Sequence, residues 1–257
     1  WVRHSTAEDW KKLMDRFHMC HYQLQAPTGF KLMARAIEPL PERADEWQER
    51  RHLLWEKVRS VGEFVDDVDR NISRAELEQL LPMHPYTALV ATQIANRFSS
   101  SQRTIFGLLE GSSAGAFRQF LESHPKDGWE LYTLDYLWDY FFEPETRELA
   151  EDMKAQDALA HYRHFRDSLA GAEQRVAKAA LLLVALERAT SDIPREMQPT
   201  LSSLKKAYAG TPIAGQLEQI VERLEEQGAL HSRPFSFGRD KHLFLPQVNL
   251  DATKVAE

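Results

Sequence analysis

Apolar residues recur at helical spacing over most of the chain, and the pattern is clearest between residues 82 and 111. Tyr86, Val90, Ile94 and Phe98 follow one another at intervals of four, which predicts one buried stripe along a helix. Pro85 suits the first position of that helix, because the N–H that proline lacks has no helical partner there. The stretch therefore predicts a helix that begins near Pro85.

A run of three serines, residues 99–101, follows this helix and predicts its end together with the cap of a second helix. The second helix is expected to end near Gly111. Its expected buried residues are Ile105, Phe106, Leu108 and Leu109.

The remaining pattern predicts a mainly α protein. Further helices are expected at 5–24, 30–37, 42–68, 73–80, 114–123, 175–189, 200–209 and 213–227, and over the run TLDYLWDYFFEP. Short strands are expected at 229–230, 234–237 and 242–245, as a small C-terminal β-hairpin around Gly238. We expect three regions: an N-terminal helical segment (1–80), a helical lid-like domain (81–170) and a winged-helix-like domain (171–257).

Three helices followed by a hairpin are the layout of a winged helix, and 213–227 takes the place of its recognition helix. That segment carries four glutamates and a single arginine, so the DNA phosphates would repel it. The hairpin is richer in cations, and Arg233, Arg239 and Lys241 are the candidate nucleic-acid contacts. A winged helix that packs against protein is the competing interpretation.

Composition narrows the class of protein. The 257 residues are 43% hydrophobic and 28% charged, with a net charge of −7, so any contact with nucleic acid has to be local. No apolar run approaches the roughly 20 residues of a membrane span. A single cysteine, Cys20, and the lack of a signal peptide predict a cytoplasmic protein in a reducing compartment. The chain begins at Trp1, and we expect it to be a piece of a longer protein.

Candidate catalytic and metal-binding residues are few. His18, Cys20 and His21 lack a further ligand at zinc spacing, and we expect no metal site. Asp135 and Asp139 share one helical face as a conceivable carboxylate pair, with no partner to raise a pKa. The sequence contains no P-loop, dinucleotide-binding, nucleophile-elbow or zinc-protease motif, so we expect no self-sufficient catalytic site.

Arg103 is the strongest candidate for binding an anion. It lies in the first turn of its predicted helix, where the helix dipole is already positive and where phosphate can bind. Arginine suits bidentate contact with phosphate. A nearby glutamate or water is the alternative partner for this side chain.

The chain resembles a family of very large bacterial ATPases at three segments. These are MHPYTALVATQIANRFSSSQRTIFGLLEG, ELYTLDYLWDYFFEP and RVAKAALLLVALERA. They are similar to the C-terminal half of AAA+ and STAND-like P-loop ATPases of anti-phage defence, such as the P-loop component of BREX systems. The resemblance covers roughly residues 80–246, and the order of helical block and winged helix agrees with it.

The resemblance implies a regulatory role for the chain. In AAA+ proteins a sensor-2 arginine of the lid contacts the γ-phosphate, and Arg103, with Gln102 and Ser101, matches that region. ATP and Mg²⁺ would bind an ATPase core upstream of Trp1, and none is expected to be bound by this chain alone. Other defence-system proteins and, through the hairpin, DNA are the implied partners, and no membrane is expected.

Two other functions remain open from the sequence. The first is an all-α adaptor that docks other proteins and has no nucleotide role. The second is a DNA-binding module that acts through the hairpin cations.

Overall fold

The structure is a computed structural model, and it describes residues 26–68, 72–97, 105–123, 130–142, 153–189 and 193–245. These residues form a mainly α fold that ends in a two-stranded antiparallel hairpin. The α-helices are α2 (Ala26–Arg35), α3 (Ala44–Val68), α4 (Arg74–Gln79), α5 (Pro85–Arg97), α6 (Ile105–Glu110), α7 (Phe117–Ser123), α8 (Leu134–Phe142), α9 (Met153–Phe165), α10 (Gly171–Ala189), α11 (Leu201–Ala207) and α12 (Leu217–Glu226). The strands are β1 (His231–Phe235) and β2 (Asp240–Phe244).

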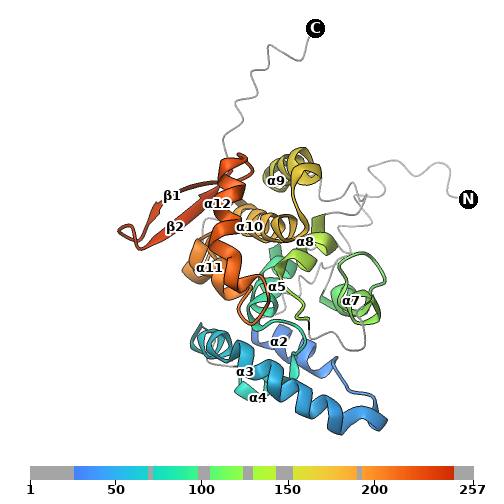
Figure 1. The fold of residues 1–257 in the computed structure, drawn as a ribbon. Coiled ribbons are helices and arrows are strands. Elements are labelled where there is room, and N and C mark those ends of the chain that lie inside the picture. Colours follow the sequence, from blue (N-terminus) through green and yellow to red (C-terminus); the bar gives the residue numbers. More distant parts are fainter. Residues whose placement is uncertain are drawn as a thin grey trace, which may run out of the picture.

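Helix α10 lies at the centre of the C-terminal part. It packs against α8 and α9 on one side and against α11, α12 and β2 on the other, and Figure 1 shows it surrounded by these elements. Its residues from Ala179 to Leu186 are all buried. This burial accounts for the almost continuous apolar run in its sequence, since a helix surrounded by other helices has little polar face.

The N-terminal helices form a second layer, in which α2 and α3 pack against α5, and α4 packs against α2 and α3 (Figure 1). Helix α4 begins with a capping box: Ser73 accepts from the backbone N–H of Glu76, and the Glu76 carboxylate accepts from the backbone N–H of Ser73. Helix α5 begins at Pro85, as predicted, and every residue from Pro85 to Thr92 is buried. The expected single stripe is therefore too narrow a description, because α5 is enclosed by both layers.

The hairpin pairs Arg233 with His242 and Phe235 with Asp240. A further antiparallel bridge joins Thr200, just before α11, to His242 on β2. The backbone N–H of Leu243 donates to the carbonyl oxygen of Pro199 at 2.7 Å. The chain segment before α11 thus runs alongside β2 and ties the hairpin to the helices.

Several expectations about local structure were wrong in detail. The strand expected at 229–230 is absent, because β1 begins at His231. Phe106 is 55% exposed, whereas Ile105, Leu108 and Leu109 are buried. Residues at spacings of three and four share one helical face, and Phe106 lies about 100° away from that face. The predicted helix 213–227 also begins later than expected, because a 3-10 turn (Ala214–Gln216) precedes α12.

Within the described ranges, no helix combines the length and the apolar character that crossing a lipid bilayer demands.

Candidate functional site

The three cations predicted to contact nucleic acid share the hairpin, but their surroundings differ. Arg233 is exposed, and its guanidinium carbon lies 5.8 Å from the centroid of the Phe244 ring. Arg239 is exposed in the turn. Lys241 is half-buried, with its Nζ 3.1 Å from Oε2 of Glu225 on α12. The charge of one of the three is therefore compensated by a neighbouring glutamate.

The outer face of α12 is acidic. Glu218, Glu222 and Glu226 are exposed on it, and Glu218 forms an ion pair with Lys205. The opposite face packs into the core through Leu217, Ile220, Val221 and Leu224. The helix thus presents mainly carboxylates to solvent, which DNA phosphates would repel.

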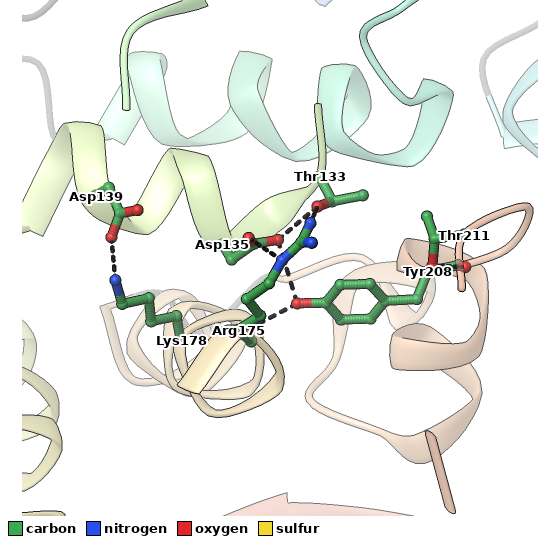
Figure 2. A network of polar contacts seen from close by, with 7 residues as sticks. All are labelled: Thr133, Asp135, Asp139, Arg175, Lys178, Tyr208 and Thr211. Carbon is green, nitrogen blue, oxygen red and sulfur yellow. Dashed lines mark hydrogen bonds and ion pairs between the residues drawn. The ribbon is translucent and has the colours of Figure 1, made fainter. Parts of the chain in front are cut away.

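A buried polar cluster joins α8, α10 and the end of α11 (Figure 2). The Asp135 carboxylate accepts from Nε of Arg175 at 2.7 Å and from the Thr133 hydroxyl at 2.5 Å. The second guanidinium nitrogen of Arg175 donates to the same hydroxyl at 3.0 Å. The Tyr208 hydroxyl donates to the carbonyl oxygen of Arg175 at 2.7 Å and lies 3.3 Å from Asp135. Four side chains from three parts of the chain therefore satisfy one another's polar groups.

The electrostatics of this cluster favour a charged pair next to a neutral phenol. Burial tends to lower the pKa of Arg175, but the Asp135 carboxylate more than offsets it and the net pKa is raised. Burial also raises the pKa of Tyr208 well above its usual range, with Asp135 acting in the same direction. Arg175 therefore stays protonated, and Tyr208 stays a hydrogen-bond donor. This arrangement is typical of a structural network and supplies no general base.

The same helix, α10, carries further charged residues that each reach a different neighbour. Near its start, Glu173 accepts from Arg223 on α12 at 2.6 Å. Lys178 donates to Asp139 on α8, and near the far end Glu187 contacts His242 on β2 at 2.8 Å. Sequence reasoning missed these pairs. The only local signal was the spacing of these residues. Asp135 and Asp139 lie four positions apart, and Arg175 and Lys178 lie three positions apart, so the members of each pair lie on the same face of their helix.

His84 connects the start of α5 to the turn after α11. It is fully buried, its Nδ1 accepts from the backbone N–H of Tyr86, and its Nε2 lies 3.2 Å from the carbonyl oxygen of Ala209. Since a carbonyl oxygen can only accept, the Nε2 carries the proton and the ring is neutral. Burial lowers the pKa of His84 to about 4, and the bond to Ala209 opposes this shift.

The other candidates are placed as follows. Arg103, Gln102 and Ser101 lie outside the described residues, as do His18, Cys20 and His21, so their predicted roles stay predictions. Asp135 and Asp139 are bound to Arg175 and Lys178 and do not form a free carboxylate pair. In the part of the chain that the structure describes, no three His, Cys, Asp or Glu side chains gather as metal ligands.

Comparison of the chain with known protein families, with curated proteins and with solved structures finds no match.

Proposed function

We propose that the chain is a non-catalytic regulatory and interaction module of a multidomain ATPase, in which a helical lid is joined to a winged helix that docks a protein partner. The observation that carries the docking role is the acidic outer face of α12, with Glu218, Glu222 and Glu226 exposed. The ATPase context rests on the resemblance to the P-loop ATPases of phage defence.

The arrangement of elements supports a winged helix. Helices α10, α11 and α12 are followed by the β1–β2 hairpin, and an isolated antiparallel bridge joins Thr200 to His242 at the open edge of β2. A winged helix has three helices followed by a hairpin in this order, and α12 would be its recognition helix.

The charge of that helix supports protein docking over DNA reading. Carboxylates at the recognition position repel DNA phosphates, whereas they complement a basic protein surface and speed its association. The hairpin cations offset this repulsion only in part, because Lys241 is already paired with Glu225.

The central helix provides a route for regulation. The Asp135–Arg175 contact and the Tyr208 hydrogen bond tie α8, α10 and α11 together without an intervening loop. In a packed core of this kind, a displacement of one helix moves its neighbours as well. The proposed lid would thus pass the nucleotide state of the ATPase core on to the docking surface.

Arg103 would contact the γ-phosphate in this mechanism. The Arg103→Ala variant should therefore lower ATP turnover of the longer protein by about ten-fold to a hundred-fold.

A charge-reversal experiment tests the premise of the docking role, that α12 holds the recognition position and that its negative charge excludes DNA. The variant E218K/E222K/E226K and the wild-type chain are titrated with a short fluorescent DNA duplex, and anisotropy is measured at low and at moderate salt. Wild type should show no salt-sensitive binding. The variant should bind DNA and lose affinity as the salt concentration rises, because the negative charge of α12 is what prevents the wild-type helix from binding phosphates.

A matched control makes the same change of charge elsewhere. Glu49, Glu56 and Glu63 are exposed at intervals of seven along α3, and E49K/E56K/E63K should not bind DNA comparably. Salt-sensitive binding by the wild type that disappears in R233E/R239E would instead establish the DNA-binding alternative. Equal DNA binding by both triple variants would show that α12 is no better placed to contact DNA than α3 is, and would contradict its assignment as a recognition helix.

A further inference from the structure

A cavity of about 400 Å³ lies between the hairpin, the start of α11 and α3. Phe64 of α3 lines one side and Phe235 of β1 another. The remaining wall comes from the 3-10 turn Arg195–Met197, from α11 with the residue before it, and from the end of the hairpin. Its residues are Arg195, Glu196, Thr200, Ser202, Ser203, Lys206, Ser236, Arg239 and Asp240. Its volume falls within the range of roughly 300–1,000 Å³ that small-molecule sites occupy.

Three cations line this cavity, and none of them forms an ion pair within the described residues. Lys206 is half-buried, and its Nζ lies 4.5 Å from the centroid of the Phe64 ring. Arg195 donates to the Ser236 hydroxyl at 2.7 Å, and Arg239 is exposed in the adjoining turn. Burial lowers the pKa of Lys206, the charges of Asp240 and Glu196 oppose this shift in part, and a bound anion would oppose it further. The three cations therefore outnumber the two carboxylates of the lining, Glu196 and Asp240, and none of the three contacts a carboxylate directly in the described part of the chain.

The two carboxylates of the lining do not cancel this charge equally. One oxygen of Asp240 accepts from the backbone N–H of Ser202 at 3.1 Å and from that of Lys241 at 2.8 Å. The Asp240 carboxylate is thus hydrogen-bonded to the backbone. One of its two donors is an N–H group at the start of α11, which is therefore not available to a bound anion. Glu196 is the remaining carboxylate, and its side chain makes no hydrogen bond or ion pair within the described residues.

We propose that this cavity binds a small phosphorylated molecule that carries a planar ring. The phosphate would contact Lys206, Arg195 and Arg239, since charge-assisted bonds from arginine and lysine are the usual recognition of phosphate. The ring would lie against Phe64 and Phe235, as nucleobases stack on aromatic side chains. The site is separate from the acidic face of α12, and it is independent of the function proposed above.

Titration of the full chain with four probes tests the proposal: AMP, ribose 5-phosphate, inorganic phosphate and adenosine. Calorimetry gives the affinities, and amide chemical shifts of Ser202 and Ser203 report on the site. AMP should bind tightest, ribose 5-phosphate next, and adenosine most weakly. No binding of any phosphorylated probe overturns the proposal. Equal affinities for AMP and ribose 5-phosphate overturn the role of the rings.

Variants assign the binding to this cavity. R239Q and K206Q should each weaken AMP binding by about ten-fold, as expected for the loss of one charge-assisted contact. E196Q should strengthen it by a few-fold, because a like charge is removed. The matched controls are R233Q on the same hairpin and K205Q on the same helix, neither of which lines the cavity, and both should bind as wild type does.

Unchanged AMP affinity in R239Q refutes the assignment. Arg239 is an exposed turn residue, so its substitution should leave the fold intact and keep this test decisive even if K206Q is unstable. Thermal melts of each variant verify folding before titration.

Discussion

The cluster around Asp135 and the surface of α12 use the same kinds of charged residue in opposite surroundings. The Asp135 side chain is 5% exposed, whereas the Glu218 side chain is 61% exposed. Removing one residue of a buried ion pair leaves the other charge unpaired and out of contact with water, which strongly destabilises the fold. Removing one residue of an exposed ion pair leaves the other charge hydrated and costs little. The interior contacts therefore determine how the helices pack, whereas the surface contacts contribute little to stability.

The largest effect should come from two glycines that differ only in their surroundings. Gly115, near α8, and Gly238, in the hairpin turn, both have φ of +77°. An added Cβ at Gly115 would lie 2.4 Å from the backbone N of Tyr140, whereas at Gly238 it would meet nothing within 4 Å. Gly238→Ala should cost about 1 kcal/mol of unfolding free energy from left-handed strain alone. Gly115→Ala should cost about 3 kcal/mol or more.

Urea unfolding monitored by circular dichroism measures both glycine variants. Equal losses would mean that the backbone around Gly115 yields, and that the interior is less rigid than its contacts indicate.

The next effect concerns Arg175. Arg175→Met should reduce the free energy of unfolding by about 3 kcal/mol, because Asp135 stays buried with only hydroxyl neighbours. The partly exposed pair is the control: Lys241→Gln should cost less than about 1 kcal/mol. Adding Asp135→Asn to Arg175→Met should recover part of the loss, since it removes the unpaired charge. A loss for Arg175→Met no larger than for Lys241→Gln would contradict the contrast between interior and surface.

The smallest effect depends on pH and on His84. Its folded pKa is about 4 and its ordinary value is 6.5, so the unfolded chain takes up this proton first as the pH falls. The contribution of the neutral His84 ring to the free energy of unfolding is fully present above pH 6.5 and is lost progressively as the pH falls towards 4. Between neutral pH and about pH 4.5 the loss should be about 2.5 kcal/mol. Stability curves of wild type and His84→Gln measure it; parallel curves would exclude His84 as the source.

Local structure was largely predictable, because short-range rules decide it. The capping box at Ser73, the start of α5 at Pro85 and the C-terminal hairpin all follow from residues close together in the chain. Helix α9, by contrast, was not predicted as an element. In the structure His161 from this helix lies 2.8 Å from the carbonyl oxygen of Ala229, a contact across 68 positions.

Long-range pairing was not predictable from the sequence. Asp135 and Asp139 were interpreted as a possible carboxylate pair, since nothing local pointed to Arg175 and Lys178 some 40 positions away. The cavity was missed for the same reason: Phe64, Lys206 and Arg239 come from three distant segments. Residues 101–103, on which the nucleotide-sensing prediction depends, lie outside the described residues, and that prediction stands as it was made.

The place of α10 has a practical consequence for dissecting the protein. A fragment that stops at residue 170 would expose the apolar sides of α8 and α9 that pack against α10. A fragment that starts at residue 171 would expose the side of α10 that packs against α8 and α9. Each fragment would have to bury that surface against something else, and aggregation is the usual result. Expression trials that cut the chain between its expected second and third regions should therefore yield insoluble material, and function has to be assayed on a piece that keeps α8 to β2 whole.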